Sequence, residues 1–294
     1  LIEISPEGLT QVHLNNSGAE AIEAAMKFAR KFTGKKGMVA MKGSYHGKSF
    51  GALSLTFNPK YKKAFAPLVE KVSFASFGDM DSLRSVIDED TAFIILEPIQ
   101  GESGIIVAPD GFLQEVRKLC NEKGILLIFD EIQAGLGRTG RLWAGEHWNT
   151  VPDILCLAKG IAGGVPMGAT LVRPDILAAI SKGEHSSTFG GNPISCAAGI
   201  AALTSITEDG LIENSKKMGE VFKEGLEKLK EKHTMIREIR GKGLMIGIEM
   251  KFEVKDILMG LIEEGVLMLY SGRNILRILP PLVIKEEDVT KVLH

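Results

Sequence analysis

The stretch Ile125-Leu126-Leu127-Ile128-Phe129-Asp130-Glu131 decides how this chain is expected to fold. Five consecutive apolar residues lead directly into two carboxylates. A run that is apolar at consecutive rather than alternating positions predicts a strand covered on both faces, as in the parallel sheets of α/β proteins. Ligands of open α/β sheets bind at the carboxyl ends of the strands, so Asp130 is the first candidate for a functional side chain.

Similar short runs recur along the chain and alternate with helical patterns. One such pattern has an apolar face of Ala21, Ile22, Ala25, Phe28, Ala29 and Phe32. Alternation of strand and helix predicts an α/β fold with a large, doubly wound, mostly parallel sheet of seven strands. The predicted strands are Gln11–Asn15, Gly37–Met41, Lys71–Phe74, Phe93–Glu97, Ile125–Asp130, Ile154–Ala158 and Ala169–Val172.

The pattern changes near residue 206, where a long, charged, amphipathic helix is predicted over Leu211–His233. Shorter elements follow it. We therefore expect two domains, a large domain over 1–205 and a small C-terminal α+β domain over 206–294. The further predicted elements are a strand at Gly243–Met250, a helix at Val254–Glu264, strands at Val266–Tyr270 and Ile275–Leu279, and a helix that begins at Glu286.

The composition is that of an ordinary globular protein, with 45% hydrophobic and 24% charged residues and a net charge of -2. The absence of a basic excess argues against a nucleic-acid or anionic-membrane partner. The three cysteines, Cys120, Cys156 and Cys196, lie far apart, which predicts neither a disulfide framework nor a metal site and favours the reducing cytoplasm. The chain begins at Leu1 without a methionine, so residues upstream of it are expected.

Two further groups are predicted at the same edge of the sheet as Asp130. The strand Gln11–Asn15 runs into Ser17-Gly18-Ala19-Glu20, which fits a capping box and also leaves free N–H groups at the positive end of a helix, where phosphate binds. The strand Ile154–Ala158 runs into Lys159, which either extends to the surface or is buried and depressed in pKa, as an imine-forming lysine requires.

A helix start for phosphate, a carboxylate and a lysine are the groups that pyridoxal phosphate requires. The carboxylate keeps the pyridine nitrogen protonated, and the lysine amine binds the aldehyde. The combination of Ser17, Asp130 and Lys159 at one sheet edge therefore predicts a pyridoxal-phosphate site.

With these motifs the chain resembles the class III, ornithine-type aminotransferases of the type I pyridoxal-phosphate fold. The resemblance extends over essentially the whole chain and is closest to the acetylornithine and carrier-protein-linked aminoadipate-semialdehyde branch. It rests on Asn16-Ser17-Gly18-Ala19-Glu20-Ala21, Tyr45-His46-Gly47, Glu97-Pro98-Ile99-Gln100-Gly101-Glu102, Asp130-Glu131-Ile132-Gln133, Gly137-Arg138-Thr139-Gly140, Ala158-Lys159-Gly160, Thr188-Phe189-Gly190-Gly191-Asn192-Pro193, and Arg277 before Pro280-Pro281-Leu282.

The resemblance implies roles for the cofactor-binding residues of the large domain. Lys159 would hold pyridoxal phosphate covalently and carry a proton during the reaction, and Asp130 would pair with the ring nitrogen. Thr188 would reach the phosphate bound by a second subunit, which implies a homodimer with shared active sites. The remaining cofactor-binding residues would be Ser17, Gly18 and Ala19 at the phosphate, Tyr45 on the ring face, His46 beside it, and Gln133 at the ring 3-oxygen.

Three residues are implied in substrate binding. Arg277 lies among apolar residues and would bind the α-carboxylate of glutamate, whereas Glu102 would neutralise it when the other amino donor is bound. Lys48 stands where the family usually has an arginine that binds the distal end of the substrate. Lysine keeps the charge but loses the bidentate fork, so distal recognition is left open.

The resemblance implies an aminotransferase that moves an ω-amino group of acetylornithine, ornithine or an N-blocked or carrier-linked lysine to 2-oxoglutarate. The products would be glutamate and a semialdehyde, in arginine or lysine biosynthesis. A small acidic amino-group carrier protein is a further candidate partner. The alternatives are a 4-aminobutyrate aminotransferase, a glutamate-semialdehyde aminomutase, a dialkylglycine-type decarboxylase and a cofactor-binding protein without turnover. Relatives carry an N-terminal segment and a longer C-terminal helix, so weak activity is expected if this chain is complete.

Overall fold

The computed structural model describes residues 1–294 and divides the chain into two compact units. The large unit comprises Leu1–Pro98, Ala108–Gln133 and Gly145–Thr204. The small unit comprises Ile99–Val107, Ala134–Ala144 and Ser205–His294. Two short segments that precede residue 205 thus pack with the C-terminal part of the chain.

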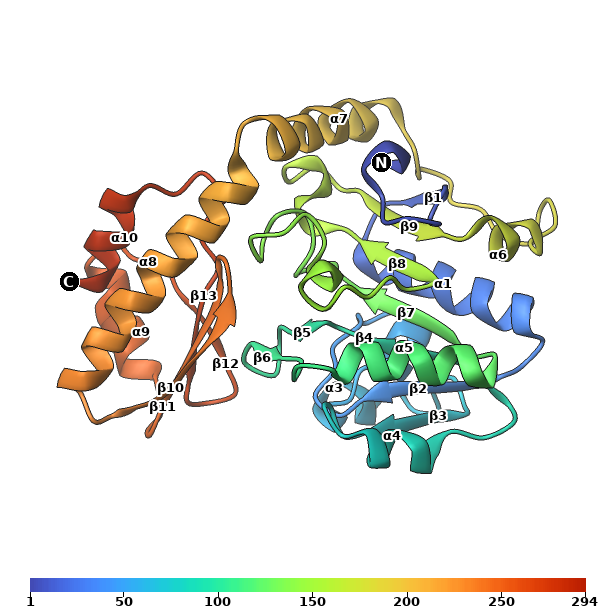
Figure 1. The fold of residues 1–294 in the computed structure, drawn as a ribbon, viewed down its shortest axis with the longest axis horizontal. Helices are drawn as coiled ribbons and strands as arrows, with labels where there is room; N and C mark the ends of the chain where they lie inside the picture. The colour runs from blue at the N-terminus through green and yellow to red at the C-terminus, as the bar shows by residue number, and fades with distance from the viewer. The chain divides into compact units, whose positions relative to one another are not determined.

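The large unit is built on a seven-stranded sheet with the order β1-β9-β8-β7-β4-β2-β3 (Figure 1). All neighbours are parallel except β9, which runs antiparallel to both β1 and β8. The doubly wound, mostly parallel sheet predicted from the sequence is confirmed. The strands are β1 (Gln11–Asn15), β2 (Gly37–Met41), β3 (Val72–Ala75), β4 (Thr91–Leu96), β7 (Leu126–Asp130), β8 (Ile154–Leu157) and β9 (Gly168–Val172).

Helices cover both faces of this sheet. The buried face of α1 (Gly18–Thr33) packs with Ile128 and the residues of β4 and β8 that point the same way. The helix α5 (Phe112–Lys123) lies on the other face against β7 (Figure 1). Helices on two faces explain why the central strands are apolar at consecutive positions. Phe32, which was expected on the apolar face of α1, is 36% exposed because it lies in the last turn of that helix.

The start of α1 is capped by its own sequence. Ser17 Oγ accepts a hydrogen bond of 3.2 Å from the Glu20 N–H, and Gly34 ends the helix in the left-handed conformation. The other elements of the large unit are short. They are η1 (Ile2–Ile4), α2 (Phe50–Leu55), α3 (Pro59–Lys62), η2 (Lys63–Phe65), α4 (Met80–Val86), η4 (Lys159–Ala162) and α6 (Pro174–Ala178), while η3 (Ala144–Trp148) and α7 (Pro193–Glu208) extend across a boundary between the units.

The small unit contains a four-stranded antiparallel sheet with the order β10-β11-β13-β12. The strand β10 was not predicted because only Ile236 and Ile239 are apolar in the stretch Ile236–Lys242, and its charged residues suit an edge strand. Gly243, predicted inside a strand, instead forms the turn between β10 and β11 with a positive φ of 51°. The elements are β10 (Ile236–Lys242), β11 (Met245–Met250), β12 (Leu269–Ser271), β13 (Ile275–Ile278), the hairpin β5 (Ile99–Gln100) and β6 (Ile106–Val107), and helices α8 (Leu211–Lys232), α9 (Lys255–Glu263) and α10 (Glu286–Leu293).

The small unit has its own apolar core, formed where α8 and α10 pack on the sheet. Met218, Phe222 and Leu226 of α8 contribute one side of it, and Ile246 and Ile248 of β11 contribute the other. No helix of the chain combines the length and the apolar content needed to cross a membrane.

Candidate active site

Asp130 closes β7 and is buried, as the sequence predicts. Its Oδ2 lies 2.7 Å from Nδ1 of the buried His46, and its Oδ1 accepts the Ile132 N–H at 3.0 Å. The other ring nitrogen of His46, Nε2, is buried without a hydrogen-bond partner. Buried polar atoms are rarely left unpaired, so His46 Nε2 is suited to a hydrogen bond with a further polar group.

The segment that carries Tyr45 and His46 is anchored to buried side chains at both of these residues. The Tyr45 N–H donates to Glu97 Oε1 at 3.0 Å, and the His46 N–H donates to Thr56 Oγ1 at 2.9 Å. Glu97 directly follows β4, just as Asp130 lies at the end of β7. Glu97 belongs to one of the motifs of the family resemblance, but the sequence predicts no role for it. These anchors fix where the Tyr45 ring and the His46–Asp130 pair can stand.

The turn after Lys48 is held by Glu23, a residue that sequence reasoning missed. Oε1 of Glu23 accepts hydrogen bonds from Ser49 Oγ at 2.5 Å, Gly51 N–H at 2.8 Å and Ala52 N–H at 3.0 Å. A Cβ on Gly51 would lie 2.2 Å from Glu23 Oε2, so a larger residue would displace this carboxylate. A carboxylate of α1 therefore caps α2 in place of the usual side chain of the cap residue itself.

Tyr45 and Lys48 meet on one further side chain, Tyr61 of α3. The rings of Tyr45 and Tyr61 pack edge to face with centroids 5.9 Å apart. Lys48 Nζ lies 4.8 Å from the centroid of the Tyr61 ring, and Lys48 is exposed. A cation held over an aromatic ring at the surface is weakly bound, which leaves Lys48 available to an anionic ligand.

The first turn of α1 offers unpaired donors. Glu20 accepts a hydrogen bond from the Asn16 N–H at 2.6 Å, one residue earlier than in a regular capping box. The backbone N–H groups of Gly18 and Ala19 have no acceptor in this chain. A Cβ on Gly18 would lie 2.8 Å from Ile132 Cδ1, so this turn packs closely on the segment after Asp130. Free N–H groups at the start of a long helix are suited to a phosphate.

Lys159 follows β8 at the same edge, since Cys156 of β8 is paired in register with Asp130 of β7. The burial of Lys159 expected from the sequence is wrong, because the chain leaves the sheet after Leu157 and the lysine side chain is exposed. Lys159 has a φ of 48°, a left-handed conformation that is unfavourable for a residue with a Cβ. Such strain is concentrated at functional sites.

Gln133 lies just beyond Asp130, and its Oε1 is buried without a partner. Together with His46 Nε2 it forms a pair of unsatisfied polar atoms near the carboxyl end of β7. The N–H groups of α1, the carboxylate and the lysine amine complete a set that fits a phosphorylated, aldehyde-bearing aromatic ring.

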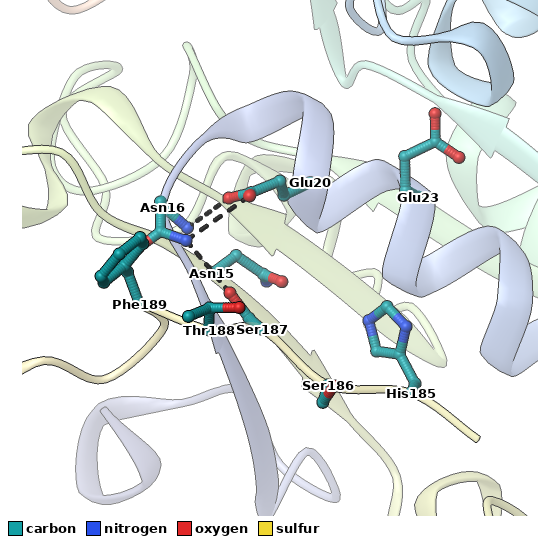
Figure 2. A pocket seen from close by; sticks show the side chains of 9 residues that line it. All are labelled: Asn15, Asn16, Glu20, Glu23, His185, Ser186, Ser187, Thr188 and Phe189. Carbon is teal, nitrogen blue, oxygen red and sulfur yellow. Dashed lines mark hydrogen bonds between the residues drawn. The ribbon is translucent and has the colours of Figure 1, made fainter. Parts of the chain in front are cut away.

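Thr188 lies in a loop beside the start of α1. Figure 2 shows this loop and the helix around a cavity of about 360 Å³. The Thr188 side chain is exposed at the rim of the cavity. Its hydroxyl forms no hydrogen bond with another group of this chain. The cavity is lined by Asn15, Asn16, Glu20, Glu23, His185, Ser186, Ser187, Thr188 and Phe189.

Arg277 and Glu102, predicted to act together, are joined within the small unit. Nη1 of Arg277 lies 2.8 Å from Glu102 Oε1 and donates to the Gly101 carbonyl at 3.1 Å. Arg277 is buried, and its Nε has no partner. The Glu102 side chain is 37% exposed, so the carboxylate is the accessible member of the pair.

The backbone on either side of Glu102 is fixed to the sheet that carries Arg277. Ser271 Oγ donates to the Glu102 carbonyl, and Arg240 Nε donates to the Gly104 carbonyl at 2.9 Å. A Cβ on Gly104 would lie 2.3 Å from Ile275 Cδ1, so the hairpin between β5 and β6 packs tightly on β13. The hairpin is held while the Glu102 side chain extends toward solvent.

The family model for class-III aminotransferases matches residues 1–294 of the chain. The acetylornithine aminotransferase of Methanopyrus kandleri is 43% identical over 295 residues, which is 100% of this chain and 75% of that protein. The LysW-aminoadipate semialdehyde/glutamate semialdehyde transaminase of Sulfurisphaera tokodaii is 43% identical over 97% of this chain and 74% of its own length. A crystal structure of the ornithine aminotransferase of Toxoplasma gondii ME49 superposes with a TM-score of 0.93 at 35% identity, covering 96% of this chain and 70% of that one.

Proposed function

The chain belongs to the class-III aminotransferase family, and from that premise we propose that it transfers a terminal amino group to 2-oxoglutarate. The amino donor is acetylornithine, ornithine or an N-blocked or carrier-linked lysine, and the products are glutamate and a semialdehyde. The family depends on pyridoxal phosphate, and one structure of the Toxoplasma gondii enzyme is described with this cofactor at its active site. Relatives named as acetylornithine and LysW-aminoadipate semialdehyde transaminases support a place in arginine or lysine biosynthesis.

One observation carries the proposal: buried acceptors without partners lie at the carboxyl edge of the sheet that also presents a helix start and a lysine. His46 Nε2 and Gln133 Oε1 are the unpartnered atoms, and Asp130 lies beside them. When bound, pyridoxal phosphate supplies an aldehyde for the amine and a protonated ring that withdraws electrons.

In the proposed site, different residues of the large unit bind different parts of the cofactor. The N–H groups of Gly18 and Ala19, with Ser17, bind the phosphate. Asp130 accepts a hydrogen bond from the protonated ring nitrogen, and His46 holds the carboxylate in place. Gln133 donates its amide to the ring 3-oxygen, an orientation open to it because the amide can rotate. Tyr45 stacks on the ring face.

Lys159 is proposed as the catalytic residue. Its Nζ holds the cofactor and then moves a proton to and from the carbon that bears the amino group. Its exposed side chain and strained, left-handed backbone at the carboxyl edge of the sheet support this role.

The Arg277–Glu102 pair is proposed to distinguish the two amino donors. With Glu102 in place, the Arg277 charge is neutralised and suits a donor that presents an uncharged chain and a terminal amine. Rotation of the partly exposed Glu102 side chain would free the guanidinium for the α-carboxylate of glutamate. Arg277 Nε, buried without a partner, is a second donor for a bidentate contact.

We infer a homodimer with shared active sites, supported by the exposed face of α7. Ile194 is 76% exposed and Ile200 is 69% exposed, and Ala197 and Ala201 lie on the same face of the helix. Phe189, which follows Thr188, continues this apolar surface. A second copy of the chain would cover it and bring each Thr188 to the other subunit's phosphate. The three unpaired cysteines support a cytoplasmic setting.

A carrier-linked donor is a second candidate, favoured by the basic cluster around α3. Lys48, Lys60, Lys62 and Lys63 form no ion pair with a carboxylate in this chain. An unpaired basic cluster suits a small acidic amino-group carrier protein.

A screen of half-reactions tests the proposed function. The holoenzyme is mixed separately with glutamate, ornithine, acetylornithine, lysine and 4-aminobutyrate, and the loss of the cofactor absorbance band is followed. We expect glutamate and acetylornithine to bleach the band and 2-oxoglutarate to restore it. Failure of glutamate to bleach it would favour an aminomutase or decarboxylase of the same fold, and no response to any donor would contradict an aminotransferase.

A further inference from the structure

The loop that carries Thr188 presents this residue outward between two anchors. Thr188 and Phe189 form its exposed tip, and Phe189 is 71% exposed. Both anchors join the loop to the β1–α1 segment that contains the phosphate-binding turn. Figure 2 shows the one between Ser187 and Asn16.

The anchor before the tip centres on Lys27 of α1. Lys27 Nζ lies 2.8 Å from His185 Nδ1 and donates to the Glu184 carbonyl at 3.3 Å. An ammonium group has only donors, so His185 Nδ1 must accept, and the imidazole is neutral with its proton on Nε2. Burial, Lys27 and His13 together lower the pKa of His185, in agreement with a neutral ring.

The His185 ring is also held by packing. Its centroid lies 4.7 Å from that of His13 on β1 and 5.3 Å from that of Phe28 on α1. Lys31, one turn further along α1, forms a 2.7 Å ion pair with Glu184, but both side chains are largely exposed and the pair adds little. The bond from Lys27 to His185 is therefore the polar contact that orients this ring.

A second anchor lies at the base of the tip, where Ser187 directly precedes Thr188 and Gly190 directly follows Phe189. Ser187 Oγ accepts hydrogen bonds from Asn16 Nδ2 at 3.0 Å and from the Gly190 N–H at 3.1 Å. A Cβ on Gly190 would lie 2.1 Å from the Leu14 carbonyl oxygen, so the backbone here lies directly on β1. Ser187 and Gly190 thus hold the base of the tip on the β1–α1 segment, and the anchor at Lys27 holds the stretch of chain that leads into it.

We propose that Lys27 is a positioning residue for the phosphate contact of Thr188. Through His185 it fixes the loop to α1, the helix whose first turn binds the phosphate of its own subunit. This inference rests on the proposed function, in which Thr188 completes the phosphate site of the other subunit. The helix α1 thereby contributes to both sites of the homodimer, to one through Gly18 and Ala19 and to the other through Lys27.

The test measures cofactor binding by equilibrium dialysis rather than turnover. All variants carry Lys159→Ala, so that pyridoxal phosphate binds reversibly and its dissociation constant is defined. Thr188→Val, Lys27→Met and the double variant are compared, with Lys27→Arg as the conservative replacement. Lys123→Met, which removes an exposed lysine of α5, is the matched control for charge. Sedimentation velocity establishes that each variant remains a dimer.

We expect Thr188→Val to weaken binding about tenfold, since it removes a hydrogen bond to a charged group. Lys27→Met should weaken it about threefold or more, Lys27→Arg should restore it, and Lys123→Met should leave it unchanged. In the Thr188→Val background, Lys27→Met should not weaken cofactor binding further, because the hydroxyl that Lys27 is proposed to position is then absent.

The outcomes separate the inference from the function it rests on. Equal effects of Lys27→Met with and without Thr188 would show that Lys27 acts elsewhere, and the inference would be overturned while the Thr188 contact stands. No effect of Thr188→Val would overturn the phosphate contact itself and the inference with it. Failure of Lys27→Arg to restore binding would also count against the hydrogen bond to His185.

Discussion

The carboxyl edge of the large sheet and the Arg277–Glu102 pair of the small unit differ in whether their buried polar groups have partners. At the sheet edge, buried polar atoms such as His46 Nε2 and Gln133 Oε1 are left without partners. In the small unit the charge of Arg277 is already matched by Glu102 at 2.8 Å. The comparison teaches that the first region has polar atoms ready for a further group, as the proposed cofactor requires, whereas the second would have to exchange one partner for another to act as proposed.

The physical difference lies in how each region is supported. Around Asp130, the groups proposed to touch the cofactor are fixed by further buried hydrogen bonds, for example from Tyr45 to Glu97. Around Arg277 the backbone of the hairpin is fixed, whereas the Glu102 side chain, although paired with Arg277, is partly exposed. Substitutions should therefore affect all donors at the sheet edge and only one class of donor at Arg277.

The largest effect is expected for Lys159→Ala. The variant should lose turnover and retain pyridoxal phosphate, since the phosphate and ring contacts of Ser17, Gly18 and Asp130 remain. Turnover is measured with glutamate and 2-oxoglutarate, and bound cofactor is measured by dialysis. If the variant kept more than about a few percent of the parent rate, Lys159 would not be the catalytic residue.

Asp130→Asn should slow both half-reactions by orders of magnitude, because a neutral amide cannot hold a proton on the ring nitrogen. His46 would also lose its charged acceptor. Single-turnover bleaching with glutamate and with the ω-amine donor measures the two halves separately. Asp110→Asn, at an exposed position of the same unit, is the control. Equal rates in the Asp and Asn forms would refute the assignment.

Arg277→Ala should damage the glutamate half-reaction far more than the ω-amine half-reaction. Loss of a charge-assisted bidentate contact costs ~1.5–3 kcal/mol, roughly ten- to a hundredfold in rate. Glu102→Gln should shift selectivity toward glutamate, because Arg277 is no longer neutralised. Single-turnover rates with each donor decide the matter. If Arg277→Ala slowed both donors equally, Arg277 would be a structural residue of the small unit.

A smaller effect is expected at Lys48, the residue that the family resemblance implies in binding the distal end of the substrate. Lys48→Ala should weaken the substrate that carries a distal carboxylate or a carrier protein, by about tenfold or less. The loss should shrink as salt is raised, since an exposed charge is screened. Binding measured at low and high salt checks this, with Lys123→Met as the control. A loss that is independent of salt would argue that Lys48 acts through its packing on Tyr61.

The smallest effect concerns pH and the two histidines that pack behind the Thr188 loop. Burial is the first cause that lowers the pKa of both His13 and His185 from the usual histidine value of 6.5, and Lys27 is the second. The unfolded chain therefore takes up protons that the folded chain does not. The free energy of unfolding should fall as the pH drops through 6.5 toward the lowered pKa values.

Thermal midpoints at about pH 7.5 and about pH 5.5 measure this dependence, on either side of the ordinary histidine range. The parent should lose more stability on acidification than His185→Asn, which has one titrating ring fewer. Carboxylates contribute equally in both proteins and cancel in the comparison. An identical loss in both would show that His185 is as easily protonated folded as unfolded.

Much of the large unit could be predicted because its signals are local. Consecutive apolar residues identify β2, β4, β7 and β8 within one or two residues of their ends, since only strands buried on both faces tolerate such runs. The residues at their carboxyl ends follow directly, because parallel strands end at one edge. The edge strand β10 gave no such signal, since its burial is partial and its sequence mostly polar.

The amino-acid sequence by itself determined the alternation of elements, the candidate groups Asp130 and Lys159 and the helix start at Ser17. These depend on periodicity and on the order of residues along the chain. Only the tertiary structure decided that Lys159 is exposed, that Glu23 caps another helix and that Lys27 holds the loop of Thr188. The contacts of Glu23 and Lys27 join residues that are distant in sequence. Hydrogen bonds between such residues leave no local pattern in the sequence, because each partner is an ordinary polar residue until the fold brings the two together.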